Sequence, residues 1–277
     1  FPKENALMKM IGYFNDKKVG AVTTLITVDK PKTFLQKLQE LEYYVAFGFW
    51  HKSLSVIDSL YVTPGPMSIY RKSALKDIGG YDEKNMTEDL EIALNLKKHG
   101  YKIACCTSTK AVTTVPHNIS GFLRQRLRWY RGAVYNFFFK HRGLFFNKKN
   151  KDFGYFIFPI ISFSIFLTAS IAFGYIFLNF KGITNFFYII FLKLYNGVFS
   201  LDFRIDPLLI PSYFINAFVI LLIWSYFLYN SLRLDKERNI KAGKIHAFIY
   251  LIFYGLIVGI IYFISIFQEF SWIKKKW

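Results

Sequence analysis

The second half of the chain contains three long apolar stretches, and these constrain its fold more than any other feature. They run from Phe153 to Phe180, from Leu208 to Tyr229 and from Ala247 to Phe267. A helix needs about 20 predominantly apolar residues to cross a bilayer, and each stretch is long enough. Residues 1–150 are mixed and partly charged. The sequence therefore predicts a soluble unit of domain size followed by a membrane unit.

The number of spans depends on the segment 183–201, which is apolar but carries Lys193 near its middle. A charge at the bilayer centre costs about 2.5–3.5 kcal/mol on insertion scales, which the surrounding apolar residues could offset. Three spans place the basic clusters 140–151 and 231–244 inside the cell. Four spans place the second cluster outside and the 274–276 tail inside. The positive-inside rule favours three spans.

The net charge of +18 suggests a nucleic acid, an anionic lipid or an anionic substrate as partner. Much of this charge flanks the apolar stretches, which fits a positive-inside membrane protein better than a nucleic-acid binder. No zinc-finger spacing or RNA-binding aromatic motif accompanies it. We therefore expect a membrane, and no nucleic acid, among the partners.

Cysteines and histidines are expected to be structural. Cys105 and Cys106 are adjacent on a predicted strand, where neighbouring side chains point to opposite faces, so we expect two small core residues and no disulfide. The histidines show no pairing that suggests a metal site, and we expect surface or loop positions for four of them, namely His51, His99, His117 and His141.

The first half alternates predicted strands and helices, which is typical of an α/β domain. The predicted strands run from Val19 to Val28, Val56 to Val62, Ser68 to Arg71 and Tyr101 to Val115. The predicted helices cover 3–14, 34–50 and 87–100, and a turn is expected at 78–82.

The segment from Ile119 to Lys140 predicts a different kind of helix, because its first half is rich in arginine and its second half in aromatic residues. Such a helix is typical of the membrane interface. The chain thus divides into three predicted parts: 1–118, an α/β unit; 119–152, an interfacial helix and basic linker; and 153–277, three or four transmembrane helices.

The helix that begins after Thr87 carries two acids at its start, Glu88 and Asp89. Threonine is a good N-cap, and acids in a first turn interact favourably with the positive helix end. A structural explanation therefore suffices for these residues taken alone.

The basic helix presents a second group of candidate residues. Gln125 and Trp129 share a face, and Arg128 lies beside Gln125. The guanidinium fork of arginine suits a diphosphate, and an indole face suits the apolar face of a sugar ring. The alternative is an interfacial helix whose tryptophan anchors at the lipid headgroups.

The other arginines of this helix have two interpretations. Arg124 and Arg131 form a cationic stripe with Arg128, whereas Arg126 lies off that face, so its removal should be milder. For Arg124, Arg126 and Arg131, binding to a diphosphate and binding to lipid phosphates both stay open.

The two groups together resemble the processive family 2 glycosyltransferases. In that family, which includes cellulose, chitin, hyaluronan and poly-N-acetylglucosamine synthases, a Thr-Glu-Asp helix start is followed by Gln-x-x-Arg-Trp and then by membrane spans. The resemblance covers most of residues 1–132, and its further segments are Leu38-Gln39, Glu42-Tyr43, Pro64-Gly65-Pro66, Ile69-Tyr70-Arg71, Gly79-Gly80-Tyr81-Asp82 and the Thr113 to Pro116 segment. It implies the C-terminal part of a GT-A-like α/β domain.

The resemblance also implies roles for single residues. Asp89 would be the general base that deprotonates the acceptor hydroxyl, and Glu88 would support it. Gln125 and Arg128 would bind the diphosphate of the nucleotide-sugar, expected to be a UDP-sugar. The acceptor sugar would contact three residues, namely Trp129, Glu88 and Gly65. A base on one face of the anomeric carbon and a cationic leaving-group site on the other suit inverting transfer.

One part of the family pattern does not occur in this chain. The metal-binding Asp-x-Asp and the uridine-binding aspartate are absent, and the resemblance places both just before Phe1. The ligands of the expected cofactor, Mg²⁺ or Mn²⁺, would therefore lie upstream, with no metal ligand in this chain.

The sequence thus predicts a multi-pass protein of the cell membrane whose cytosolic part moves a sugar from a nucleotide-sugar to a growing polysaccharide. Two alternatives stay open. The first is a non-processive enzyme that glycosylates a membrane lipid. The second is a truncated, non-catalytic subunit for anchoring or export.

Overall fold

The computed structural model describes residues 2, 5–150, 152–178, 180–198, 212–234 and 240–271. Its helices are α1 (Ala6–Ile11), α2 (Phe34–Tyr43), α3 (His51–Val56), α4 (Lys72–Asp77), α5 (Glu88–Lys98), α6 (Ile119–Tyr135), α7 (Phe158–Leu178), α8 (Phe180–Tyr195), α9 (Ser212–Leu234), α10 (Lys244–Ile249) and α11 (Gly255–Phe270). Wider π-helical turns at 44–50, 136–140, 153–157 and 250–254 extend or join these helices.

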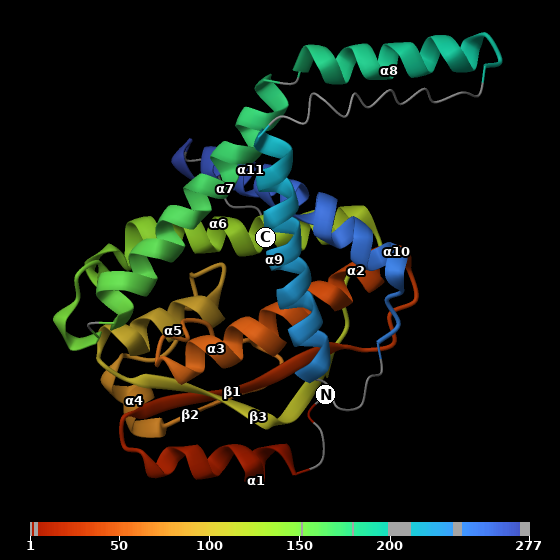
Figure 1. The fold of residues 1–277 in the computed structure, drawn as a ribbon. Helices are drawn as coiled ribbons and strands as arrows, with labels where there is room; N and C mark the ends of the chain where they lie inside the picture. The colour runs from red at the N-terminus through yellow and green to blue at the C-terminus, as the bar shows by residue number, and fades with distance from the viewer. Residues whose placement is uncertain are drawn as a thin grey trace.

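The sheet has three strands in the described residues, β1 (Val19–Val28), β2 (Ser68–Tyr70) and β3 (Lys102–Thr113), in the order β2-β1-β3. The pair β1–β3 is parallel and the pair β1–β2 is antiparallel, so the sheet is mixed. Figure 1 shows α1 on one side of the sheet, and α2, α3 and α5 on the other. The predicted α/β organisation is confirmed.

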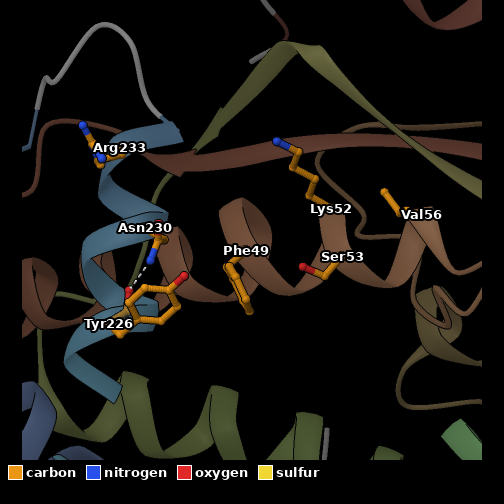
Figure 2. Close-up of a pocket in the computed structure, with 7 residues that line it drawn as sticks. All are labelled: Phe49, Lys52, Ser53, Val56, Tyr226, Asn230 and Arg233. Carbon is orange, nitrogen blue, oxygen red and sulfur yellow. Dashed lines mark hydrogen bonds between the residues drawn. The ribbon is translucent and has the colours of Figure 1, made fainter. Parts of the chain in front are cut away.

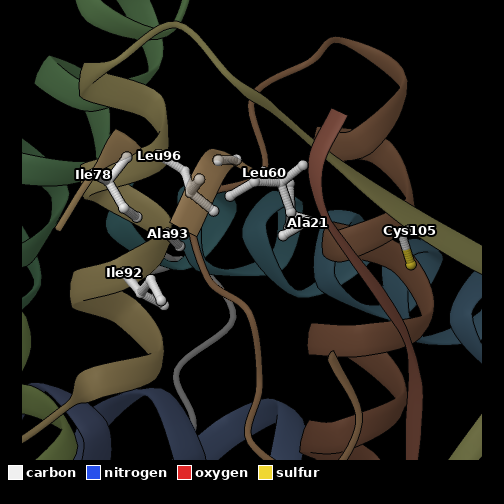
Figure 3. Packing of buried hydrophobic residues seen from close by; sticks show 9 residues of the cluster. Ala21, Leu60, Ile78, Ile92, Ala93, Leu96 and Cys105 are labelled. Carbon is white, nitrogen blue, oxygen red and sulfur yellow. The ribbon is translucent and has the colours of Figure 1, made fainter. Parts of the chain in front are cut away.

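Side chains that alternate along the strands fill two cores, one on each face of the sheet. Ala21 and Cys105 face α5 and pack in a cluster with Leu96, as Figure 3 shows. Val22 and Cys106, each the next residue along, belong to a cluster on the α1 side. Both cysteines are buried and free, which confirms the expected core positions on opposite faces.

The predicted strand from Val56 to Val62 is wrong, because the preceding helix continues to Val56. It ends in a Schellman turn, in which Asp58 has a φ of 51° and the N–H of Ser59 donates to the carbonyl oxygen of Leu54 at 2.7 Å. The following residues are irregular, although Leu60 is fully buried. Val56 and Ile57 are exposed at the end of this helix, so the β-branched composition of the segment does not correspond to a strand.

The other predicted elements of the first half are present, and α4 is an additional short helix that the sequence pattern did not indicate. The expected turn at 78–82 contains two glycines in the left-handed region, Gly79 with a φ of 83° and Gly80 with a φ of 80°. A side chain at either position would be strained.

Helix α6 lies between the α/β layer and the long apolar helices, as Figure 1 shows. It packs along α11, where the rings of Tyr130 and Tyr262 stack with centroids 4.0 Å apart, and Phe122 lies against Tyr254 at 6.4 Å. Helix α6 therefore connects the α/β layer to the apolar helices, while Leu123, Arg124 and Arg128 on it remain exposed.

Two helical stretches are long and apolar enough to cross a membrane, Phe153–Leu178 and Lys244–Phe270. Only 28% and 22% of their most apolar windows are buried in the protein, so most of this apolar surface is exposed. They match two of the three predicted spans. Many Phe, Ile and Leu side chains of these helices are therefore exposed, as a surface that faces a bilayer would require.

The remaining apolar segments bear on the number of spans. The predicted span 208–229 lies partly outside the described residues, and its described part, from Ser212 onward, belongs to α9, which contains the shorter apolar helix Phe218–Arg233. Segment 183–201 forms most of α8, which has 16 residues. A perpendicular span needs about 20 residues, so the length of α8 agrees with the three-span arrangement, which stays a prediction.

Helices α7 and α11 approach each other closely at Gly259, so a larger residue there should lower the stability of the protein. A Cβ at Gly259 would lie 2.6 Å from the Cβ of Ala172, whereas a Cβ at Gly255 on the same helix has no neighbour within 4 Å. Gly259→Ala should therefore lower the thermal midpoint of the detergent-solubilised protein, because the overpacking cost of about 1–3 kcal/mol exceeds the gain in helix propensity.

The control, Gly255→Ala, should leave that midpoint unchanged or raise it, since it gains helix propensity at no steric cost. Equal midpoints for the two variants would contradict the close crossing of α7 and α11.

Candidate active site

The two predicted site segments lie together because one face of α6 packs on the turn that precedes α5. Arg128 donates from Nη1 to the carbonyl oxygen of Met86 at 3.1 Å. One helical turn later, a Cβ at Gly132 would lie 2.3 Å from Oγ1 of Thr87, so only glycine permits this approach. The start of α5, which carries Glu88 and Asp89, is therefore held against the helix that carries the second motif.

Thr87 stands at the N-cap position of α5, as expected, but its side chain does not cap the helix. Its Oγ1 instead accepts a hydrogen bond from Nδ2 of Asn136 at 3.1 Å, within the interface with α6. The capping role predicted for the Thr87 side chain is thus wrong. The Thr87 hydroxyl hydrogen-bonds across the contact between the two helices and does not cap the N-terminus of α5.

Asp89 is half-buried in the first turn of α5, and its Oδ1 accepts from the N–H of Leu90 at 2.8 Å. Burial raises the pKa of the Asp89 carboxyl above its usual value, and the charge of Glu88 raises it further. The Leu90 N–H and the charge of Arg128 act in the opposite direction and do not cancel the increase. A raised pKa suits a proton acceptor at neutral pH.

Thr63, the residue before the Pro64-Gly65-Pro66 loop, is hydrogen-bonded to the backbone of Asp89. Thr63 donates to the carbonyl oxygen of Asp89 from its N–H at 3.2 Å and from its Oγ1 at 2.8 Å. Tyr70, on β2, donates to Oγ1 of Thr63 at 3.0 Å. The loop that contains exposed Gly65 therefore starts beside the backbone of Asp89.

Of the motif on α6, Arg128 is exposed, and Gln125 and Trp129 are half-buried. The Gln125 Oε1 accepts from Nη1 of Arg126 at 3.3 Å. The Arg126 guanidinium carbon lies 4.4 Å from the centre of the Trp129 ring. Trp129 is thus packed on an arginine and against a buried cluster next to β1.

Two arginines are not where the sequence interpretation placed them. Arg126 is fully buried and forms an ion pair with Glu42 on α2. Arg131 is also buried, and its Nε lies 3.3 Å from the Glu269 carboxylate on α11. Both join α6 to neighbouring helices, so neither is free to bind a diphosphate or lipid phosphates, and we expect substitution of Arg126 to affect stability.

The expected surface or loop position is wrong for His51, which lies in α3, whereas His141 lies in a bend between helical segments but is buried. His51 and His141 are buried, and burial lowers the pKa of His51 to about 3. His141 lies 3.2 Å from the Glu91 carboxylate, which also contacts Lys140 at 2.7 Å. No three or more His, Cys, Asp or Glu side chains gather to bind a metal ion in the part of the chain that the structure describes.

The structure also identifies residues that sequence reasoning missed. Asn85 and Asn136, both buried, hydrogen-bond to each other across the interface between α5 and α6. Glu91 lies one turn beyond the predicted acids and ties α5 to the end of α6 through Lys140 and His141. Nothing in the local sequence marks these polar residues as partners, although Asn136 follows Gly132 at helical spacing.

An open pocket lies elsewhere, between α3 and α9, and includes none of the predicted site residues. Figure 2 shows its seven lining residues, which are Phe49, Lys52, Ser53, Val56, Tyr226, Asn230 and Arg233. Its volume is about 610 Å³. It combines aromatic walls with two cations and is separate from the start of α5.

The structure thus contains a mixed α/β unit in which the acidic start of α5 packs against a helix that carries Gln125, Arg128 and Trp129. Together these segments define a candidate transferase site beside apolar helices. Residues 2–267 match the family described as Glycosyl transferase family group 2. The chain therefore belongs to the family 2 glycosyltransferases.

Within this family the chain is similar to two poly-β-1,6-N-acetyl-D-glucosamine synthases. It is 32% identical over 116 residues to that of Staphylococcus epidermidis, which covers 42% of this chain and 28% of the relative. It is 29% identical over 119 residues to that of Staphylococcus aureus strain COL, which covers 43% of this chain and 29% of the relative. The match thus spans less than a third of these relatives.

Proposed function

We propose that this chain is part of a membrane-bound inverting glycosyltransferase that extends a polysaccharide from a nucleotide-sugar, with UDP-N-acetylglucosamine as the first donor to test. The proposal is carried by the contact between Arg128 and the Met86 carbonyl. This contact holds a candidate diphosphate-binding helix against the turn that leads to Asp89. The similarity to poly-β-1,6-N-acetyl-D-glucosamine synthases supports a hexosamine polymer.

In the proposed reaction Asp89 accepts the proton of the acceptor hydroxyl. The acceptor oxygen then attacks the anomeric carbon from the face opposite the diphosphate, and the bond between that carbon and the diphosphate oxygen breaks. Gln125 and exposed Arg128 bind the departing diphosphate, whose negative charge increases in the transition state. The acceptor sugar is held by Trp129, Glu88 and the loop around Gly65.

The described residues do not fit a metal site, so no step is assigned to a metal here. The resemblance places the Asp-x-Asp ligands of Mg²⁺ or Mn²⁺ before residue 1. We propose that the donor's metal ion and nucleoside are bound by that upstream part of the protein.

Membrane attachment is supported by the two exposed apolar helices and by the basic residues next to the apolar segments. We propose a multi-pass protein of the cell membrane with its α/β unit in the cytosol. That location gives the site access to cytosolic nucleotide-sugars.

The function is tested with the protein produced with the residues that precede Phe1 in its gene, purified in detergent and given radiolabelled UDP-N-acetylglucosamine with Mg²⁺ or Mn²⁺. We expect label in polymer that grows with time. Label in solvent-extractable lipid would indicate the lipid-glycosylating alternative. No transfer from any of a panel of UDP-sugars would support the non-catalytic alternative.

The pKa of Asp89 gives a second, sharper prediction. Because the charge of Glu88 raises the pKa of Asp89, Glu88→Gln should lower it. A base is active above its pKa, so the acid limb of the pH profile of kcat/KM should move to lower pH in this variant, whatever its effect on the profile's height.

The matched control is Glu83→Gln, which neutralises an exposed acid on the preceding turn and should leave the acid limb in place. An unchanged limb in Glu88→Gln would show that Asp89 is not the group that titrates.

A further inference from the structure

We infer that the buried amide pair Asn85–Asn136 is a positioning device for Asp89, which keeps the base at a fixed place relative to the diphosphate-binding residues of α6. This inference rests on the proposed function. Neither asparagine belongs to the two motifs, and neither is placed to contact substrate. They act through the turn that leads into α5.

The amide pair is reciprocal and fully enclosed. Nδ2 of Asn85 donates to Oδ1 of Asn136 at 2.9 Å, and Nδ2 of Asn136 donates back to Oδ1 of Asn85 at 3.1 Å. Asn85 is 5% exposed and Asn136 is 0% exposed. Buried hydrogen bonds are directional and costly to leave unmade, so the pair allows one relative placement of the turn and α6.

Both asparagines also hold Thr87. The N–H of Thr87 donates to Oδ1 of Asn85 at 3.1 Å, and Nδ2 of Asn136 donates to Oγ1 of Thr87 at 3.1 Å. Thr87 is the last residue before α5, and its carbonyl oxygen accepts the N–H of Glu91 at 2.9 Å. The position of Thr87 therefore sets where α5 begins, and with it where Asp89 lies.

Three contacts from one face of α6 and of the π-helical turn 136–140 that continues it secure the turn before α5. They fall at Arg128, Gly132 and Asn136, which are four residues apart and therefore share a face. Arg128 binds the Met86 carbonyl, Gly132 lies against Thr87, and Asn136 binds Asn85. The same helix thus carries the proposed diphosphate-binding residues and the groups that hold the start of α5.

The opposite side of Asp89 is held independently. Thr63 donates twice to the Asp89 carbonyl oxygen, so the base is fixed between α6 and the 63–66 loop. A second connection between α5 and the end of α6, from Glu91 to Lys140 and His141, does not depend on the amide pair. Variants of the amide pair can therefore stay folded while the turn shifts.

Chemistry explains why small errors in this placement matter. A general base works only within hydrogen-bond reach of the proton it takes, about 2.6–3.2 Å between heavy atoms. A displacement of about 1 Å can reduce a rate by 10²-fold. Two amides locked by reciprocal hydrogen bonds restrict such movement better than an apolar contact, which allows sliding.

The test compares Asn85→Leu, Asn136→Leu and the double variant in the full protein. Each single variant leaves the other amide buried without its partner, so both thermal stability and turnover should fall. The double variant leaves no orphaned partner amide of the pair but still removes the asparagine partners of the Thr87 N–H and Oγ1, so its thermal midpoint should recover part of the loss. Its kcat should stay about 10–100-fold below that of the parent, with nucleotide affinity changed by less than about threefold.

The matched control is Asn95→Leu, which replaces a half-buried asparagine of α5 whose Nδ2 donates to the carbonyl oxygen of Ile78, a residue outside α6. Its kcat should stay within about twofold of the parent. A double variant with recovered stability and parental kcat would overturn the inference, because a purely structural pair predicts that the two quantities recover together.

If the double variant does not fold, Asn136→Gln decides the question, since it keeps the amide but lengthens the side chain by one carbon. A folded Asn136→Gln protein should lose at least about tenfold in kcat, and parental kcat would overturn the inference. Asp89→Asn in the same assay separates the two proposals. If Asp89→Asn is active, the proposed function fails; if it is inactive while the double variant is fully active, only the positioning inference fails.

Discussion

Asp89→Asn is expected to lower sugar transfer by about 10²–10⁴-fold while leaving the fold intact, the span typical of a positioned general base. The substitution keeps the size of the side chain, and its amide oxygen can still accept the N–H of Leu90, which lies 2.8 Å from Oδ1 of Asp89. Burial raises the pKa of Asp89, which means that the site disfavours the charged form. A neutral amide should therefore not destabilise the protein.

The measurement is radiolabelled sugar incorporation by the purified full protein, with UDP affinity and the thermal midpoint determined alongside. Nucleotide affinity should persist, because the proposed diphosphate contacts lie on Gln125 and Arg128. Asp77→Asn is the control: this exposed acid on α4 bonds to the hydroxyl of Tyr101 and should tolerate the change. Near-parental polymer synthesis by Asp89→Asn would remove Asp89 from the chemistry.

Breaking the Glu42–Arg126 ion pair is expected to produce the largest loss of stability. Arg126 is fully buried and Glu42 is 19% exposed at its side chain, so either single substitution leaves a charge with little water and without its oppositely charged partner. Such a break costs about 3–5 kcal/mol. Arg126→Met and Glu42→Gln should each lower the thermal midpoint strongly.

The double variant Glu42→Leu/Arg126→Met should recover much of this loss, because well-packed apolar residues can replace a buried ion pair at little cost. Exposed Arg124 on the same helix is the control, and Arg124→Met should change the free energy of unfolding by less than about 0.5 kcal/mol. A small effect of Arg126→Met, equal to that of Arg124→Met, would show that Arg126 is not buried against α2 in the folded protein.

These outcomes would also distinguish ligand binding from helix packing among the arginines of α6. Arg128 is exposed and can meet a ligand, whereas Arg126 and Arg131 bind acids on α2 and α11. Substitution of Arg128 should therefore affect nucleotide binding, and substitution of the other two should affect assembly. Charge alone does not distinguish these arginines.

Much of the secondary structure could be predicted because its causes are local. The β-branched run from Val19 to Val28 is a strand, and the acids after Thr87 begin a helix, both as expected. The segment from Val56 to Val62 could not be assigned in this way. Its apolar residues match a strand pattern, but the chain ends a helix there through a left-handed Asp58, a backbone state stabilised by the turn.

The candidate site, too, could be predicted from the sequence only in part. Sequence motifs indicated Glu88, Asp89, Gln125, Arg128 and Trp129 as a group, and the structure holds their two segments together through Arg128 and Gly132. The asparagine pair was not foreseen. Asn85 and Asn136 become partners only when α6 packs on the turn before α5, and side-chain hydrogen bonds between distant residues leave no periodic signal.

The sequence by itself predicted most strands and helices of the first half, the long apolar helices of the second half and the chemical types of residue at the candidate site. These depend on periodicity, apolar length and motif spacing, which are properties of short segments. Only the tertiary structure decided which face of α6 meets which neighbour. Helical spacing places Arg126, Arg128 and Arg131 around an axis, but packing against α2, α5 and α11 determines which guanidinium is buried in an ion pair and which stays exposed for a ligand.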